Sequence, residues 1–470
     1  MNINFLSFLL VLLPYSKSLL ADDEKGKQFS LSALEIEYKE NQIDLLGDIN
    51  IKHPSAALKA EKGRVFRKEG EQGNLFSEIQ LENKVSFSFN KDSHLNGDEA
   101  VVKLDEQEAK VKALENSCVN YRTLIRNKDN VLTPLYIEAQ EFICSLQSFN
   151  PEKKDVDVKK IVASGFVKAT YGTDFLAQAD QGEYTPESKK ILLYQTDAPC
   201  QLEYQNHCLK AHKIEASVSE NMFLFYEGDG SIKKKNDGSI NFSYSKARWN
   251  KNQNTIDCSG YTLLEMLPIG KIRTTDSLHM LEKNGFYFFI CKGAAQFQYA
   301  HKGKAVHMNC DGLLIFNQKE QKCTLTPILG NKKSLFNYSY DDSVIEGTAF
   351  EIAYQTNEGQ TTPTQLKLKG PVYFSRRETS LKPFYGIAAE MDFDYSSSVW
   401  HLKGHKNQKV LFYDKTRKLS MTADEIILKL SSIGDIEHIQ GVGLIKLSFK
   451  KEELKILNNS FPSFEKNYAN

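Results

Sequence analysis

The feature that most constrains this chain is a period of two in its apolar residues. Apolar residues or glycine occupy every second position in 43–51, and apolar alternation recurs in 85–89, 296–299 and 336–340. Because successive side chains of a strand point to opposite faces, this pattern predicts strands with one apolar and one polar face. Long stretches of helical periodicity are nearly absent. We therefore expect an all-β fold.

A second pattern is an internal repeat, in which an apolar residue precedes a small residue and then an acidic one. Clear copies begin at Leu95 (LNGDEAVV), Ala177 (AQADQGEY) and Met421 (MTADEIIL). The small residue, called the anchor here, lets the backbone bend or pack closely, and the neighbouring acid is expected to mark the solvent face. Anchors recur about every 30 to 42 residues, as in stacked arrays. The clear anchors are Ala60, Gly97, Ala139, Ala179, Ala211, Gly347, Ala389 and Ala423, and weaker copies fall at Ser245, Thr275 and Met308.

The length of 470 residues exceeds what one ordinary core fills and favours about two or three domains. One break is visible, at a glycine-rich and charged stretch that contains Lys233, Lys234 and Lys235. Such a stretch is typical of a hairpin tip or a junction. We therefore predict a first half over 29–228, a hairpin tip or junction over 229–238, a second half over 239–455 and a disordered tail over 456–470.

Charge and hydropathy exclude two classes of protein. The chain has 60 Lys and Arg against 60 Asp and Glu, so it lacks the basic excess of a nucleic-acid binder, and we expect no nucleic-acid partner. No stretch approaches the 18 or more consecutive apolar residues that a membrane-spanning helix requires.

The first 21 residues have the layout of a secretory signal peptide. An apolar run from Phe5 to Leu13 is broken by Pro14, and Ala21 stands before two acids at a plausible cleavage point. No basic residue precedes the run, and Leu19 is larger than the small residue usual three positions before the cut. A buried element of the folded chain and a retained anchor are the alternatives. The interpretation as a signal peptide predicts that the protein is exported.

The eight cysteines make disulfides possible in an exported protein, but about 105 full pairings exist and the sequence does not choose among them. A local cluster contains Cys200, His207, Cys208 and His212, which are residue types that zinc prefers. Its spacing matches no common zinc framework, and alternation places His207 and Cys208 on opposite faces of a strand. We therefore predict no metal site and no cofactor.

The paired strands resemble the OstA-like repeat, in which a strand of the form G-x-V-x-apolar precedes one of the form L-x-A-D/E-x-A/G-x-apolar. The best matches are the copies at Leu95, Ala177 and Met421, and the resemblance runs from about Gln42 to about Phe449 with degenerate copies in the middle. This repeat characterises lipopolysaccharide-transport proteins A and C and the periplasmic part of protein D. The resemblance implies an open β-jellyroll of stacked antiparallel V-shaped layers, extended or in tandem, because the chain is longer than a typical protein A.

The same resemblance implies a non-catalytic periplasmic carrier or bridge, which passes lipopolysaccharide or lipooligosaccharide toward the outer membrane. Association with the inner or the outer membrane stays open. Open sheet ends leave unpaired strand edges, so the expected partners are other jellyroll transport proteins bound by end-to-end strand pairing. Alternation selects the residues expected to line a lipid-binding groove: Ile49, Ile51, Phe87, Phe89, Val167, Tyr171, Phe297, Tyr299, Phe336, Tyr338 and Phe412.

Two other functions remain as alternatives. A polysaccharide-acting β-helix enzyme would also read as repeated strands, although such coils usually repeat at shorter intervals. The sequence contains no nucleophile elbow, phosphate-binding glycine loop or HExxH motif, so we predict no catalytic residues. A structural or adhesive surface protein, with repeats that form a rigid spacer, would have a closed and fully packed interior instead of an open groove.

Overall fold

The computed structural model describes residues 30–446. Within that range it leaves out 54–55, 68–75, 90–91, 104, 129, 147–157, 234–238, 267–268, 302–303, 329–335, 341–342, 358–359, 377–382, 416–418 and 432–434. The predicted signal peptide over 1–21 and the predicted tail over 456–470 therefore lie outside the described residues, as do the side chains of Phe336 and Tyr338.

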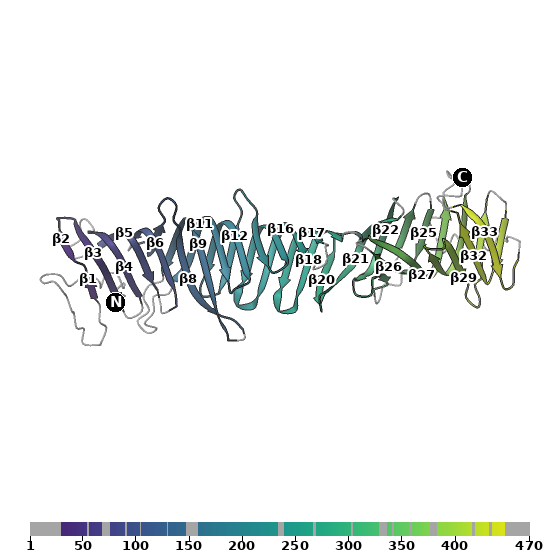
Figure 1. Ribbon diagram of the computed structural model, residues 1–470, viewed down its shortest axis with the longest axis horizontal. Coiled ribbons are helices and arrows are strands. Elements are labelled where there is room, and N and C mark those ends of the chain that lie inside the picture. Colours follow the sequence, from purple (N-terminus) through teal and green to yellow (C-terminus); the bar gives the residue numbers. More distant parts are fainter. Residues whose placement is uncertain are drawn as a thin grey trace. The chain divides into compact units, whose positions relative to one another are not determined.

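The chain divides into two compact units, Met1–Gly228 and Asp229–Asn470. The described part of unit 1 contains antiparallel strands (Figure 1) and one short 3-10 helix. Its elements are β1 (Ser30–Ser32), β2 (Glu35–Tyr38), β3 (Gln42–His53), β4 (Ala56–Arg67), β5 (Phe76–Ser88), β6 (His94–Lys103), β7 (Glu108–Lys112), β8 (Val119–Arg126), β9 (Leu132–Ala139), β10 (Glu141–Leu146), β11 (Val158–Tyr171), β12 (Phe175–Thr185), β13 (Lys190–Tyr194), β14 (Cys200–Tyr204), β15 (His207–Ser217), η1 (Val218–Glu220) and β16 (Met222–Lys233), which runs across the boundary between the units.

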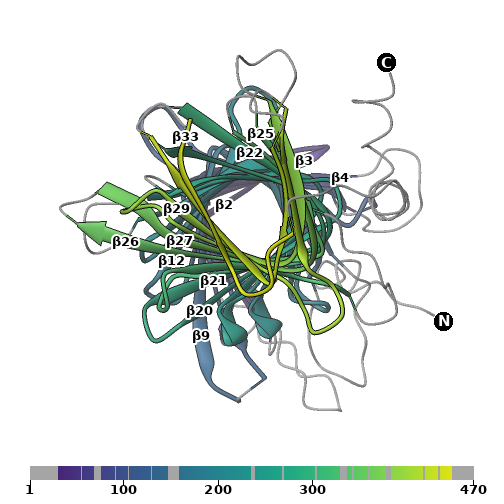
Figure 2. The same cartoon turned by 90° about the vertical axis from the view of Figure 1, so that its right-hand side faces the viewer.

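Unit 2 is also built from antiparallel strands with one short 3-10 helix in its described part. Figure 2 shows its last strands in yellow. Its elements are β17 (Ser239–Asn250), η2 (Lys251–Gln253), β18 (Thr255–Met266), β19 (Gly270–Thr274), β20 (Ser277–Lys283), β21 (Phe286–His301), β22 (Lys304–Asn317), β23 (Lys322–Thr326), β24 (Phe336–Tyr340), β25 (Ser343–Gly347), β26 (Ala349–Asn357), β27 (Gln360–Arg376), β28 (Phe384–Asp394), β29 (Val399–Lys403), β30 (Val410–Asp414), β31 (Leu419–Ala423), β32 (Glu425–Leu430) and β33 (Ile436–Val442).

The expectation of an all-β fold is confirmed. Strand pairing is antiparallel throughout the described residues, and no described helix is long and apolar enough to cross a bilayer. The predicted alternation is present: Ile43, Leu45, Ile49 and Ile51 are all at most 8% exposed, whereas Leu46 between them is 45% exposed. The period of two in the sequence therefore corresponds to an inner apolar face and an outer face.

Long strands such as β11 and β12 bend in their middle, and their two halves pair with different neighbours. In β11, the half that contains Ile161 pairs with β10, whereas the half that contains Tyr171 pairs with β9. The two halves are separated by a register shift between Ser164 and Val167. β12 follows the same bend, because Phe175 and its neighbours pair with β14 and the opposite half pairs with β13. We call the line of bends the corner of a unit.

The two halves of the folded sheet that meet at the corner are called arm A and arm B. In unit 1, β8, β9 and β14 belong to arm A, whereas β7, β10 and β13 belong to arm B. In unit 2, β19, β24, β25, β30 and β31 belong to arm A, and β20, β23, β26, β29, β32 and β33 belong to arm B. The strand ends farthest from the corner form the seam, where arm A faces arm B.

The backbone at the corner uses left-handed conformations. Gly165 has φ +77° and Gly370 has φ +87°, and both lie within register shifts. A Cβ added to Gly370 would overlap the Oγ1 atom of Thr348, so the bend at this site requires glycine for space as well as for conformation. Phe166 adopts φ +52° without being glycine, and its side chain is 87% exposed.

The glycine-rich stretch near the boundary has a simple structure where it is described. Residues 229–233 continue β16, and 234–238 lie outside the described residues. Glu227 has φ +50°, which marks a bend in β16 next to the boundary between Gly228 and Asp229.

Candidate functional site

The residues predicted to line a groove are placed in the interior, between arm A and arm B of their own unit. Each of the nine whose side chains are described is at most 8% exposed: Ile49, Ile51, Phe87, Phe89, Val167, Tyr171, Phe297, Tyr299 and Phe412. Phe336 and Tyr338 belong to β24, in register with Gly347 and Ile345, and only their backbone is described. The sequence pattern therefore selected interior positions from both units.

Aromatic rings dominate the interior of unit 2. Phe297 and Tyr299 stack with ring centroids 5.5 Å apart, and Tyr354 packs edge-on to Tyr299 at 6.5 Å and lies 6.3 Å from Phe316. Because Phe297 belongs to arm A and Phe316 to arm B, this cluster joins the two arms through apolar contact. Such a surface suits hydrocarbon, since it offers no charge that a fatty chain would have to desolvate.

One cavity between the arms of unit 1, in the part of the interior that the structure describes, is small. Its volume is about 10 Å³, close to the room that one water molecule needs. It is lined by Ile137, Ile161, Ala163, Val167, Ala169, Gly182, Glu183, Tyr184, Ile191 and Leu193. An acyl chain does not fit into this cavity as it stands, so occupation of this part of the interior would require the arms to separate.

The corner is held by carboxylates of the repeated motif. Asp180, next to the anchor Ala179, accepts hydrogen bonds at 2.7, 2.7 and 3.2 Å from the backbone N–H groups of 196–198, in the loop between β13 and β14. Asp98, next to Gly97, accepts from the N–H of Leu114 at 2.8 Å and from the hydroxyl of Ser117. At these two copies the motif acid is therefore a structural acceptor for the next corner loop, a role that the sequence analysis did not predict.

The same contact occurs at two copies of the repeat in unit 2. Asp424, next to Ala423, accepts from the N–H of Leu444 at 3.0 Å, and Asp276 accepts from the N–H of Ala294 at 2.8 Å. The weak copy at Thr275 is therefore a real corner. The copy at Met308 is not, because Met308 lies opposite Phe297 within arm A, away from the bend at Gly293.

These hydrogen bonds favour the ionised carboxylates. Backbone N–H groups of Asp197 and Thr196 lower the pKa of Asp180 to about 2. The hydroxyl of Ser117 and the backbone N–H of Leu114 likewise hold the pKa of Asp98 below its usual value. The corner therefore carries charged acceptors at neutral pH.

The seam of unit 1 is closed by a loop from arm A. The N–H of Lys128, between β8 and β9, donates to the carbonyl of Ser219 at 3.3 Å, and its Nζ lies 3.4 Å from Glu220 in η1. Lys189, in the β12–β13 turn of arm B, donates from Nζ to the carbonyl of Arg126 at 3.1 Å. These contacts join strand ends that no ladder hydrogen bond connects in the described residues.

The seam of unit 2 is closed by two side-chain pairs. The hydroxyl groups of Tyr299 and Tyr395 lie 2.7 Å apart in a buried hydrogen bond. Tyr299 is near the far end of β21 in arm A, and Tyr395 follows β28 in arm B. Arg376, at the end of β27 in arm A, donates to Asp435 at 2.9 Å, and Asp435 closes the β32–β33 turn of arm B.

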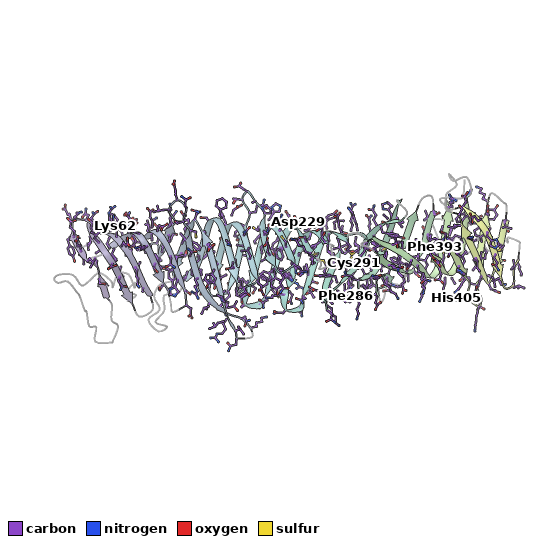
Figure 3. All side chains as sticks on the ribbon, viewed as in Figure 1. Lys62, Asp229, Phe286, Cys291, Phe393 and His405 are labelled. Atoms are coloured by element: carbon purple, nitrogen blue, oxygen red, sulfur yellow. The ribbon has the colours of Figure 1, made fainter. Side chains whose placement is uncertain are left out.

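All eight cysteines are free thiols, which answers the pairing question that the sequence left open. Cys291, Cys310 and Cys323 are at most 5% exposed in unit 2 (Figure 3 labels Cys291). Burial raises the pKa of the Cys291 and Cys310 thiols to about 12. His207 is buried and Cys208 is not, which confirms that they occupy opposite faces of β15. Within the described part of the chain, no group of three or more His, Cys, Asp or Glu could hold a metal ion.

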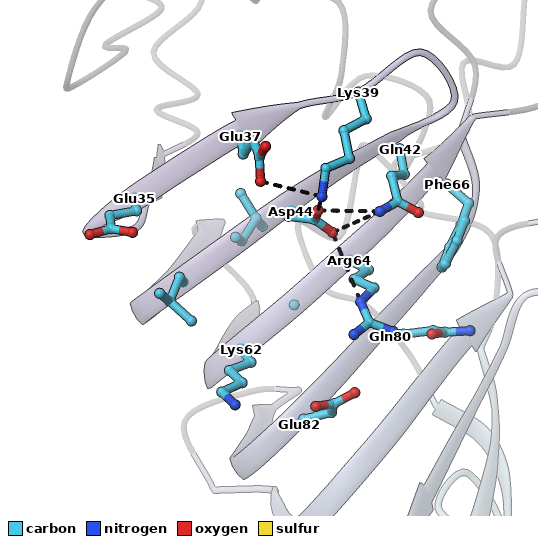
Figure 4. Close-up of a pocket in the computed structure, with 13 residues that line it drawn as sticks. Glu35, Glu37, Lys39, Gln42, Asp44, Lys62, Arg64, Phe66, Gln80 and Glu82 are labelled. Atoms are coloured by element: carbon cyan, nitrogen blue, oxygen red, sulfur yellow. Dashed lines mark hydrogen bonds and ion pairs between the residues drawn. The ribbon is translucent and has the colours of Figure 1, made fainter.

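A polar concavity of about 490 Å³ lies on the outer face of arm B in unit 1 (Figure 4). Its charged groups largely pair with one another: Asp44 accepts from Lys39 and from Gln42, and Arg64 lies 3.9 Å from Asp44. The hydrogen bond from Lys39 lowers the pKa of Asp44. This concavity could not be predicted from the sequence, because it depends on how neighbouring strands curve.

No protein-family model matches this chain, and no curated protein sequence matches it. The assignment of function therefore depends on the chain's own residues and geometry.

Proposed function

We propose that this protein is a non-catalytic, periplasmic carrier for an acylated glycolipid of the lipopolysaccharide or lipooligosaccharide class. The observation that carries the proposal is the apolar interior between the arms of each unit, which is lined by the residues that the alternation selects. The sequence resemblance to the OstA-like repeat supplies the substrate class.

The physical need for such an interior is large. Each CH₂ group of a fatty chain exposed to water costs about 0.8 kcal/mol, so a lipid with several chains faces a barrier of tens of kcal/mol in an aqueous gap. An interior of aromatic and branched aliphatic side chains removes that barrier without any chemical step. A carrier of this kind therefore needs no catalytic residue and no cofactor.

The terminal strands support the proposed partners. In the described residues, β1 and β2 pair only with β3, and β33 pairs only with β32. Apolar side chains lie exposed beside both edges, with Leu34 74% exposed and Leu444 64% exposed. Unpaired backbone and exposed apolar side chains favour strand addition by a similar sheet, so end-to-end pairing with other jellyroll transport proteins remains part of the proposal.

A rigid structural spacer is the second candidate function. The observation that favours it is the close packing around one described cavity of about 10 Å³ between the arms of unit 1, as expected of a part of the interior that stays closed. A carrier must instead admit lipid between its arms. The two functions therefore differ in whether the interior can be occupied.

The decisive experiment asks whether lipid enters the interior. A photo-crosslinking phenylalanine analogue at Tyr171, which is 8% exposed, should capture lipopolysaccharide in a producing host, as read by mass spectrometry of the crosslinked chain. The matched control is the same analogue at Tyr136 in unit 1, which is 39% exposed and should capture none. A protein that purifies without lipid, binds no added lipopolysaccharide and gives no crosslink at Tyr171 would rule out the carrier and favour the spacer.

A further inference from the structure

We infer that the seam of unit 2 is the gate through which a fatty chain reaches the interior, and that the Tyr299–Tyr395 hydrogen bond is the latch that holds this gate closed. The inference rests on the proposed carrier function for its ligand, but the latch itself is a property of the fold. The inference follows from a difference between the corner and the seam, which join arm A to arm B by different kinds of contact.

The corner cannot serve as the gate. At the corner each long strand passes from arm A to arm B, so separation there would require breaking the chain's own ladders. β27 illustrates this, since it pairs continuously with β28 on both sides of the bend at Gly370, with one register shift between Lys369 and Val372. The motif carboxylates add further hydrogen bonds, such as that from Leu444 to Asp424. The corner is therefore a hinge.

The seam of unit 2 can open without breaking a strand ladder of the described residues. Two side-chain pairs cross it, Tyr299 with Tyr395 and Arg376 with Asp435. A net hydrogen bond contributes modestly to stability, because water or a ligand can replace the lost partner. Opening by rotation about the hinge would break these contacts and separate the apolar cluster that joins the arms, while the strand ladders of the described residues stay intact.

The tyrosine pair suits a latch for lipid better than an ion pair does. Its rings belong to the apolar cluster, with Tyr299 beside Phe297 and Tyr395 4.7 Å from Phe393. When the hydroxyl groups separate, each can bond water or a polar headgroup while its ring still contacts hydrocarbon. The Arg376 and Asp435 side chains are 14% and 22% exposed, so water already reaches this pair.

The unit 2 thiols provide a test that needs no lipid. Cys291, Cys310 and Cys323 are buried inside unit 2 and should react with N-ethylmaleimide only when the interior opens. Tyr299→Phe removes one hydroxyl and keeps the ring, so we expect labelling of these three thiols to become about five- to tenfold faster. Tyr395→Phe should give the same increase, and the double variant should give no further increase, because both substitutions remove the same bond.

Two controls separate opening of the gate from loss of stability. Tyr373→Phe removes a buried hydroxyl of the same unit outside this pair and should leave the labelling rates unchanged. Cys144, which is fully buried in unit 1, reports on wider unfolding and should keep its rate in every variant. Equal acceleration of Cys144 and Cys291, or no acceleration in Tyr299→Phe, would overturn the latch.

A lipid probe then tests the connection to function. Association of cis-parinaric acid, followed by its fluorescence, should be about five- to tenfold faster in Tyr299→Phe than in the wild type. Faster labelling without any binding of the probe or of lipopolysaccharide would overturn the carrier function and keep the latch. Binding at the same rate in both proteins, with unchanged labelling, would keep the carrier and overturn the latch.

Discussion

The corner and the seam enclose the same interior but are built in opposite ways. The corner is a repeated device, in which a motif acid such as Asp180 or Asp424 accepts hydrogen bonds from the backbone of the next corner. The seam is held by contacts that differ between the units: a lysine-containing loop in unit 1, and a tyrosine pair with an ion pair in unit 2. The difference shows that the repeated motif supplies the contacts of the corner. The contacts of each seam come from residues that lie outside the repeated motif and differ between the units.

The largest expected loss of stability comes from substitutions in the apolar core between the corner and the seam. Phe412 is fully buried and packs against Phe374 and Phe384 at 6.3 and 6.1 Å. Phe412→Ala should lower the free energy of unfolding by about 3–5 kcal/mol in denaturant titrations. Phe286→Ala, at a side chain that is 39% exposed (Figure 3), should cost less than about 1 kcal/mol. If Phe412→Ala lowers the unfolding free energy by less than about 1 kcal/mol, the surrounding side chains must move to fill the cavity that the substitution leaves.

The corner should be intolerant of side chains at its glycines. Gly370→Ala forces a Cβ into a left-handed position and against Thr348, so we expect a loss of about 2–4 kcal/mol in unfolding free energy. Gly285→Ala is the matched control, because its φ of +78° is similar but no atom lies within 4 Å of the added Cβ. It should cost about 1–2 kcal/mol. Equal losses in the two variants would show that backbone strain alone determines the effect.

The seam side of unit 1 should lose stability in mild acid. Burial lowers the pKa of His207 to about 4, against about 6.5 in the unfolded chain. Its contribution is therefore full above about pH 6.5 and is lost as the pH falls toward 4, since only the unfolded chain takes up the proton there. His207→Gln should remove on the order of 2 kcal/mol of that pH dependence. Urea titrations at pH 7.5 and pH 4.5 measure the unfolding free energy at both pH values. If this free energy falls by the same amount in the variant as in the wild type, His207 is not the source of the pH dependence.

The corner should lose stability at a lower pH than the seam side of unit 1. Asp180 has its pKa lowered to about 2 by backbone N–H groups, so its contribution is present above about pH 4 and is lost as the pH falls toward 2. Asp180→Asn should reduce the melting temperature by about 2–4 °C at pH 5 and by less at pH 2.5. Thermal melts of both proteins at the two pH values check this. A decrease of the same size at pH 2.5 would show that the charge of the acceptor is unimportant.

The smallest effect is expected at the seam of unit 1. Lys128 and Glu220 have side chains that are 64% and 44% exposed, and exposed ion pairs contribute about 0–1 kcal/mol. Lys128→Ala keeps the backbone bond to Ser219 and should change the unfolding free energy by less than about 0.5 kcal/mol. Denaturant titration at low and high salt measures the change. A loss above about 2 kcal/mol would remove the contrast between corner and seam.

Much of the fold could be predicted from the sequence, because a period of two determines which side chains face inward. Phe87 and Phe89 were placed correctly, and so were Phe297 and Phe412. The anchor positions also carried real information, since Gly97 and Ala179 precede the acids that hold the corners. The role of those acids was missed, because the N–H groups that they accept from are 16 to 18 residues away.

The seam could not be predicted, because its contacts follow no repeat. Tyr299 and Tyr395 are separated by 96 residues, and nothing in their local sequence indicates that they meet. Arg376 and Asp435 are likewise 59 residues apart. The left-handed conformation of Phe166 was equally hidden, since aromatic residues rarely adopt it.

The motif acid also bears on how such a protein can change in length. Asp98 and Asp180 each complete the corner of the following layer rather than their own. A duplicated layer that carries this acid would bring the acceptor for the corner of its successor, so the backbone N–H groups at the join would keep their partner. Each additional layer adds two strand spacings of about 4.8 Å. Evolution could in this way adjust the number of layers without redesigning the rest.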